Sequence, residues 1–217
     1  LVSSNITEEQ NVSSVPIKQA VAKGASLVVI DQRETELTRY ATKWLRPKIG
    51  TEVALIGAMI KTIIDESLEN HDFITENCIE FDPFRNSIWL YDQAKASDIT
   101  GIPQEDIREA SRLIGGASSA SILYGLETVS KPIKKDCVKL LIDLALCTGN
   151  ITGEASGLYP LTTGANDQGS RDVGCDPRLG PGYTEVPIGI GIESLADSIR
   201  SGDIKALQII GDAPNLS

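Results

Sequence analysis

The sequence predicts an α/β fold with a mostly parallel sheet and flanking helices. Short apolar, β-branched runs alternate along the chain with segments whose apolar residues recur at helical spacing. In the run Ser26–Ile30 every residue after Ser26 is apolar, as expected of a strand that is buried on both faces of a parallel sheet. With 217 residues, 41% of them hydrophobic, the chain is long enough for one well-buried core or two small ones.

The first half of the chain alternates strand and helix. Leu1–Asn5 resembles the end of a buried strand, and Ser26–Ile30 is the next strand. Between them, Val15–Lys23 is predicted as a short amphipathic helix with Ser14 as its cap, Pro16 in its first turn and Gly24 as its stop. Glu52–Leu68 has apolar residues on one face and is predicted to be a helix that packs on the sheet.

The second half continues the alternation. His71–Leu90 holds two short apolar clusters that indicate small helices and turns. A proline-led helix follows Pro103 and stops at Gly115. Apolar spacing then predicts a strand, two helices and a last strand, over Ala120–Tyr124, Lys134–Thr148, Ile192–Ser201 and Ala206–Ile210. Residues 150–183 are rich in glycine, proline and polar residues, which predicts a long cofactor-facing or partner-facing loop.

Charge and composition exclude several classes of function. A net charge of -10 would repel a phosphate backbone, which argues against nucleic acid as a partner. No apolar run approaches the roughly 20 residues of a membrane span, so we expect none, with the cytoplasm as the default location. The four cysteines form no CxxC pair, which favours reduced, buried thiols, and Cys175 alone is expected to be exposed. The first residue is not Met, and the first five residues resemble the end of a strand. We therefore expect the sequence to be a piece of a longer polypeptide.

Candidate site residues follow the predicted strands, because ligands of parallel sheets bind at the carboxyl ends of the strands. The segments are Ser4–Glu8, Asp31–Arg33, Gly125–Glu127 and Gly211–Pro214. Small polar residues between a strand and a helix can hold a phosphate. A carboxylate at the end of the next strand can bind the hydroxyls of a ribose.

Together the first two segments predict half of a nucleotide site, although neither GxGxxG nor a P-loop is present. The alternative is structural: Asp31 only caps a turn, and Arg33 only pairs with Glu36 on the surface. The single histidine, His71, is expected to be a solvated residue at a helix start rather than a general base.

Several ordered motifs resemble the large catalytic subunit of molybdopterin guanine dinucleotide oxidoreductases, and formate dehydrogenase alpha subunits in particular. They lie in Gly24–Leu37, Trp44–Leu55, Leu144–Ile151, Gly164–Gly174, Pro181–Tyr183 and Ile204–Pro214. The resemblance covers nearly all of the chain. It implies a Rossmann-like, dinucleotide-binding α/β portion, residues 1–217, inside a larger multidomain enzyme.

The resemblance also implies residues that bind the cofactor, a molybdopterin guanine dinucleotide with molybdenum or tungsten. Ser4, Asn5 and Glu8 resemble the loop that meets the dinucleotide, Asp31 and Arg33 the pair at the guanosine ribose, and Gly50 and Glu52 a turn near the guanine. Gly125 resembles a loop near the pterin, and Gly164 and Asn166 belong to a further matching motif. No catalytic residue and no metal ligand is expected in this chain.

The sequence departs from the family pattern at four of its motif positions. Glu127 stands where a glycine is usual, Gln32 where a proline is usual, Gln10 in place of a histidine, and Glu52 in place of a shorter acid or amide. The bulk and charge of Glu127 would hinder close approach of the cofactor.

The family implies an iron–sulfur cluster, a metal ligand and a C-terminal dinucleotide-binding domain outside this sequence. The expected partners are the rest of its own catalytic subunit and electron-transfer iron–sulfur subunits. Alone, the chain is expected to be inactive. The preferred hypothesis is therefore that this chain is part of a formate dehydrogenase-like enzyme that oxidises a small substrate by two electrons. The alternatives are a cofactor-less scaffold domain of the large iron–sulfur subunit of an NADH:quinone dehydrogenase, and a stand-alone nucleotide-binding module.

Overall fold

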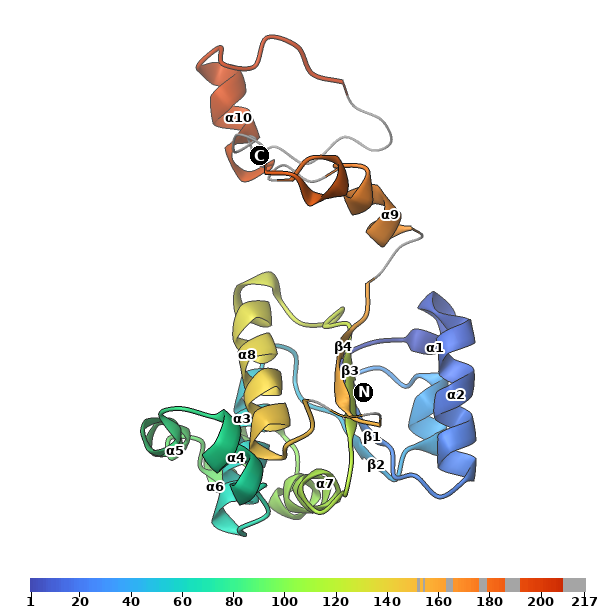
Figure 1. The fold of residues 1–217 in the computed structure, drawn as a ribbon, viewed down its shortest axis with the longest axis vertical. Coiled ribbons are helices and arrows are strands. Elements are labelled where there is room, and N and C mark those ends of the chain that lie inside the picture. Colours follow the sequence, from blue (N-terminus) through green and yellow to red (C-terminus); the bar gives the residue numbers. More distant parts are fainter. Residues whose placement is uncertain (152, 154, 163–165, 176–178, 186–191, 209–217) are drawn as a thin grey trace. The chain divides into compact units, whose positions relative to one another are not determined.

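The computed structural model describes residues 1–151, 153, 155–162, 166–175, 179–185 and 192–208. The chain divides into two compact units, Leu1–Thr163 and Gly164–Ser217. All four named strands lie in the first unit (Figure 1). None of the helices in the described part combines the length and the apolar character needed to cross a membrane.

The sheet of the first unit is parallel. Strands β1 (Val28–Ile30) and β2 (Lys43–Leu45) pair in parallel, and so do β3 (Ser121–Tyr124) and β4 (Gly157–Pro160). Val2 forms parallel bridges with both Ile30 and Tyr124, so the first residues of the chain lie between β1 and β3. The order across the sheet is β2, β1, the Val2 segment, β3 and β4. This arrangement confirms the predicted α/β class and the strand-like start of the chain.

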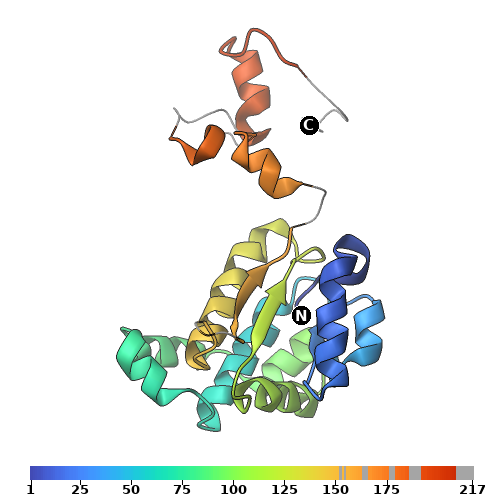
Figure 2. The ribbon, with the colours of Figure 1, turned by 45° about the vertical axis from the view of Figure 1, so that its right-hand side comes forward.

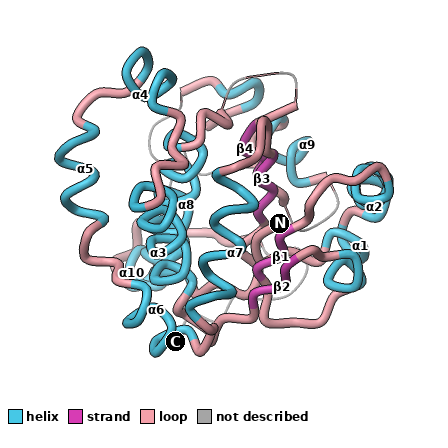
Figure 3. Tube along the Cα trace, turned by 90° about the horizontal axis from the view of Figure 1, so that it is seen from below, coloured by secondary structure: helices cyan, strands magenta, loops and turns pink. Residues whose placement is uncertain are grey.

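Helices cover both faces of the sheet. Figures 1 and 3 show α1 and α2 on one side of the strands and α3, α7 and α8 on the other, and Figure 2 shows the same separation of α2 (blue) from α8 (yellow). The helices are α1 Ile6–Glu9, α2 Asn11–Ala22, α3 Glu52–Asp65, α4 His71–Asn77, α5 Phe81–Ile88, α6 Gln93–Thr100, α7 Gln104–Gly115, α8 Lys131–Cys147, α9 Asp167–Asp172 and α10 Ile192–Arg200, with 3-10 turns η1 Glu36–Tyr40 and η2 Pro181–Tyr183.

The predicted start of α2 is wrong. Helix α2 begins at Asn11, so Ser14 and Pro16 lie inside it, and the Ser14 hydroxyl donates to the carbonyl oxygen of Asn11. Both Val12 and Val15 are exposed, so the apolar residues near the start of α2 do not mark the face that it buries.

The strand predicted over Ala206–Ile210 does not form over residues 206–208, which are exposed, and Ile209 and Ile210 lie outside the described residues. A strand needs a neighbouring strand for its backbone hydrogen bonds. In the described part of the second unit, the only extended pairing is a single bridge between Leu179 and Glu185. Within residues 150–183 the structure has β4, α9 and η2. The cofactor-facing or partner-facing role of this segment stays a prediction.

Helix α3 is the centre of the main core. It contacts α6, α7 and α8. Its apolar residues Leu55, Ile56, Met59, Ile60 and Ile63 are each 0% exposed. Because α3 begins at Glu52, this packing fixes the position of Glu52 at the same edge of the sheet as Gln32, with which it forms a hydrogen bond.

The packing of α3 on Tyr91 leads to the first testable prediction. A Cβ at Gly57 would overlap the ring of Tyr91. Gly57→Ala should therefore destabilise the protein by about 1–3 kcal/mol through overpacking, although alanine is the better helix former by about 0.5–1 kcal/mol. Thermal unfolding of the polypeptide that carries this sequence would measure the change. In a protein that also carries Tyr91→Ala, Gly57→Ala should lower the free energy of unfolding by less. An equal loss with and without Tyr91→Ala would refute the overlap.

Candidate functional site

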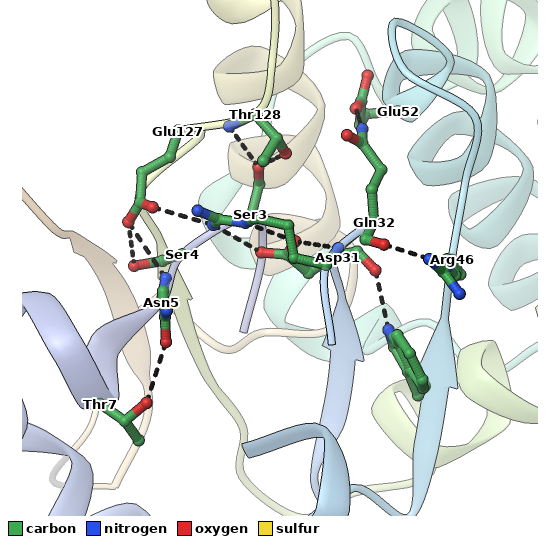
Figure 4. A network of polar contacts seen from close by, with 12 residues as sticks. Ser3, Ser4, Asn5, Thr7, Asp31, Gln32, Arg46, Glu52, Glu127 and Thr128 are labelled. Atoms are coloured by element: carbon green, nitrogen blue, oxygen red, sulfur yellow. Dashed lines mark hydrogen bonds and ion pairs between the residues drawn. The ribbon is translucent and has the colours of Figure 1, made fainter. Parts of the chain in front are cut away.

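Polar side chains gather at the carboxyl edge of the sheet (Figure 4). The chain leads from the Val2 segment to β1 and β2 on one side, and later to β3 and β4 on the other. The topological switch point, where ligands of such sheets bind, therefore lies between the Val2 segment and β3. Ser3, Ser4 and Asn5 follow the first of these strands, and Glu127 and Thr128 follow the second.

Asp31 and Arg33 form the centre of this edge. Nε and Nη2 of Arg33 each donate to one oxygen of Asp31 at 3.1 Å, and Nη2 also donates to Oε2 of Glu127 at 2.9 Å. The Asp31 side chain is 1% exposed, that of Glu127 13% and that of Arg33 39%. The hydrogen bonds with Asp31 raise the pKa of Arg33 further above its ordinary value, so the guanidinium stays charged.

The structural alternative for these two residues is half correct. Oδ1 of Asp31 accepts a hydrogen bond from the backbone N–H of Arg33 at 2.8 Å, so Asp31 does cap a turn. Arg33 does not pair with Glu36, which forms its ion pair with Lys18. Arg33 instead points to the two carboxylates that meet at the sheet edge.

Glu127 joins the two sides of the switch point. Its Oε1 accepts hydrogen bonds from the Ser4 hydroxyl at 2.9 Å and from the backbone N–H of Asn5 at 3.2 Å. The backbone N–H of Glu127 donates to the carbonyl oxygen of Ser3 at 2.9 Å. The hydroxyl groups of Ser3 and Thr128 also pair. The loop after β3 is thus fastened to the loop after the Val2 segment by backbone and side-chain contacts together.

This closeness explains Gly125. A Cβ at Gly125 would lie 2.9 Å from both Cβ and Oγ of Ser4, so only glycine allows the two loops to meet. Ser3 and Leu126 have φ values of 47° and 53°, a left-handed conformation that non-glycine residues rarely adopt. Each costs roughly 1–3 kcal/mol, and the contacts between the two loops hold them there.

Glu52 is connected to the same edge through Gln32. The side-chain amide of Gln32 donates to Oε1 of Glu52, and the backbone carbonyl oxygen of Gln32 accepts from Nε of Arg46 at 2.8 Å. Glu52 is 1% exposed, and its Oε2 has no hydrogen-bond partner. Gly50, with a φ of 84°, lies exposed in the turn before α3. Gln32 thus supplies the side chain that holds Glu52.

A pocket of about 450 Å³ lies beside this network. It is built from the chain segments that follow the Val2 segment and β1, and its lining residues are Thr7, Glu8, Glu34, Thr35, Glu36 and Arg39. Thr35 is 6% exposed, and its hydroxyl has no hydrogen-bond partner. The structure therefore places the predicted residue Glu8 in the pocket wall, while Ser4, Asn5, Asp31, Arg33 and Gly125 meet in the network.

Sequence reasoning missed two features of this edge. Thr35 was not named as a candidate, although it lies two residues after Arg33, whereas Thr7 belongs to the predicted segment Ser4–Glu8. Glu127 was expected to obstruct a ligand, and its contacts with Ser4, Asn5 and Arg33 were not foreseen. Of the remaining predicted residues, Gly164 lies outside the described residues, and Asn166 precedes α9 in the second unit with a φ of 63°. The Gly211–Pro214 segment is also outside them.

The described residues contain no group of three or more His, Cys, Asp or Glu side chains that could hold a metal ion. His71 is exposed at the start of α4, as predicted. The four cysteines are free thiols: Cys137 and Cys147 are buried, Cys78 is partly buried and Cys175 is exposed. Burial raises the pKa of both Cys137 and Cys147 to about 12.

A model of the molybdopterin oxidoreductase family matches residues 1–216. The F420-dependent formate dehydrogenase subunit alpha of Methanocaldococcus jannaschii is 37% identical over 87% of this chain and 28% of its own length. The NADPH-Fe(3+) oxidoreductase subunit alpha of Geobacter sulfurreducens is 30% identical over 91% of this chain and 25% of its own length. Formate dehydrogenase H of Escherichia coli is 30% identical over 90% of this chain and 30% of its own length.

Among solved structures, acetylene hydratase from Pelobacter acetylenicus matches with a TM-score of 0.66 and 28% identity. That match covers 71% of this chain and 21% of the hydratase. The chain thus spans less than a third of the length of each of these four proteins.

Proposed function

The chain belongs to the molybdopterin oxidoreductase family, and we propose that it is part of a formate dehydrogenase-like catalytic subunit. In this proposal it holds one end of a molybdopterin guanine dinucleotide at the carboxyl edge of its sheet. The observation that carries the proposal is the buried Asp31 carboxylate that fixes Arg33 beside the polar residues Ser4 and Asn5, at the switch point where such folds bind nucleotides.

The residues at this edge fit a guanosine in their chemistry. Guanine presents N–H donors, which carboxylate and hydroxyl oxygens accept. Glu52 and Thr35 each carry a buried oxygen without a partner, and both lie on segments next to Asp31 and Arg33. When bound, the cofactor would supply a metal centre for two-electron chemistry, and the residues of this chain would bind and orient it.

The proposal extends to the complete protein. We infer a small substrate such as formate, electron transfer to iron–sulfur subunits, a cytoplasmic location, and a longer polypeptide that carries the iron–sulfur cluster and the metal ligand. The names of the relatives support this, since they include a formate dehydrogenase subunit alpha and formate dehydrogenase H.

One observation favours a second candidate, a scaffold domain without cofactor. The donors that would face a phosphate, the Ser4 hydroxyl, the Asn5 N–H and Nη2 of Arg33, all have Glu127 as an acceptor. In a scaffold without cofactor these donors need an acceptor from the protein itself, because unpaired buried donors are destabilising.

The cofactor content of the complete protein tests the proposal. Wild type, Asp31→Asn and Arg33→Lys would be purified from their own cells and assayed for pterin, for GMP released by acid, and for molybdenum and tungsten. We expect the wild type to carry pterin, GMP and one of the two metals, and the content of both variants to fall to about half or less, since a lost charged hydrogen bond costs about 1.5–3 kcal/mol.

Lys43→Gln is the matched control. It removes a charge that pairs with Asp106 and Glu109 at the amino end of β2, away from the proposed site. The pterin, GMP and metal content of Lys43→Gln should equal that of the wild type. A wild type with neither pterin nor metal would support the scaffold, and unchanged content in all variants would refute the site assignment.

A further inference from the structure

Three hydrogen-bond donors from two chain segments converge on the carboxylate of Glu127. They are the Ser4 hydroxyl at 2.9 Å, the Asn5 backbone N–H at 3.2 Å and Nη2 of Arg33 at 2.9 Å. A hydroxyl, a main-chain amide and a guanidinium are the donors by which proteins bind phosphate groups. The carboxylate therefore fills a position with the chemistry of an oxyanion site.

The donors are held in place by groups other than Glu127. Arg33 is fixed by two hydrogen bonds to Asp31, which is itself buried. Ser4 is 2% exposed, and the Asn5 side chain accepts a hydrogen bond from Thr7 at 3.0 Å. Removal of the carboxylate would leave these donors converging on the same point.

The carboxylate can leave without unfolding its loop. The backbone of this loop is fastened separately, by hydrogen bonds from the N–H of Glu127 to the Ser3 carbonyl and from the N–H of Thr128 to the Ser3 hydroxyl. The Glu127 side chain is 13% exposed and so reaches solvent at the sheet edge. A rotation of this side chain alone would open the position.

We propose that the Glu127 carboxylate is an internal ligand of an oxyanion site formed by Ser4, Asn5 and Arg33, and that a phosphate group must displace it to bind there. The inference rests on the proposed function for the identity of that group, the diphosphate of a guanine dinucleotide. The site is then self-occupied when empty of ligand, and its affinity for phosphate is set by the competition with Glu127.

The competition has a measurable size. An apparent dissociation constant rises by the inverse of the fraction of molecules in which the site is open, so a carboxylate that is bound nine-tenths of the time weakens binding by about tenfold. Glu127→Ala should therefore bind inorganic pyrophosphate at least about tenfold more tightly than wild type. Glu127→Gln keeps the shape, removes the charge and should show a smaller gain in the same direction.

The test uses the complete polypeptide, produced in cells unable to make the pterin, with pyrophosphate titrated by calorimetry. Glu66→Gln is the matched control, because Glu66 also pairs with arginines, Arg108 and Arg112, and lies just after the end of α3 opposite to Glu52. Equal affinity in all four proteins would overturn the proposal, and so would an equal gain in Glu66→Gln. If Glu127→Ala fails to fold, Glu127→Gln decides alone.

A second measurement separates this inference from the proposed function. The pterin and GMP content of the wild type from its own cells reports on the function, whereas the pyrophosphate titration reports on Glu127. A gain in pyrophosphate affinity with no pterin in the wild type would leave the oxyanion site standing and refute the cofactor. Full pterin content in the wild type without any gain in pyrophosphate affinity would support the cofactor and refute the displacement of Glu127. Addition of Arg33→Ala to Glu127→Ala should abolish the gain.

Discussion

Replacement of Arg33 with alanine should cause a large loss of local stability at the sheet edge. Asp31 and Glu127, at 1% and 13% side-chain exposure, would both lose their counterion. Leaving a buried charge without its partner costs about 3–5 kcal/mol, which corresponds to a factor of roughly 10²–10⁴ in the opening equilibrium. Amide hydrogen exchange of peptides covering Ser3–Asn5 and Glu127 would measure this opening in the complete protein.

Controls distinguish this loss from the removal of any arginine. Arg112→Ala breaks an ion pair with Glu66 in which the arginine side chain is 50% exposed, and exposed pairs contribute about 0–1 kcal/mol. Arg33→Lys keeps the charge, but a lysine ammonium cannot reproduce the planar set of donors that binds both carboxylates. Its loss of local stability should therefore be intermediate. Glu127→Gln combined with Arg33→Ala should recover part of the stability, because only Asp31 remains unpaired. Exchange in Arg33→Ala within fivefold of wild type would contradict the account.

The sequence was sufficient to locate the sheet edge because its signals are local. Leu27–Ile30 is apolar without interruption, its last three residues are β-branched, and Asp31 follows it directly. Since every ligand-binding edge of a parallel sheet is formed by the residues after its strands, the two loops at Ser4 and Asp31 could be named without knowing how they meet. The structure brings Ser4, Asn5, Asp31 and Arg33 into one network.

The contacts of Glu127 could not be predicted in the same way. Arg33 and Glu127 are 94 residues apart in sequence, and nothing in either local pattern indicates the other. Their pairing depends on the placement of β3 next to the Val2 segment, which is a property of the tertiary fold. The same limit applies to Thr35, whose unpartnered hydroxyl becomes apparent only once the pocket around it is formed. Local periodicity also failed at the start of α2, because the apolar residues Val12 and Val15 near that start are exposed and do not mark its buried face.

The thiols of α8 should be almost inert in the folded protein. Burial raises the pKa of Cys137 and Cys147 from 9.0 to about 12. At pH 8 this lowers the thiolate fraction about a thousandfold, and the thiolate is the species that reacts with iodoacetamide. Cys175 is exposed and should be alkylated rapidly. Mass spectrometry of peptides from the folded protein would give the rate at each site.

Denaturation in urea should make all four cysteines react at similar rates, which serves as the control. Rapid alkylation of Cys137 in the folded protein would contradict the packing of α8. The same burial predicts a dependence of stability on pH. The folded-state pKa lies above the unfolded value, so the stabilisation by the two neutral thiols is complete below about pH 9 and is lost as the pH rises toward 12. Stability should therefore decline across that alkaline range, and replacement of both cysteines with alanine should flatten the decline while it weakens the core.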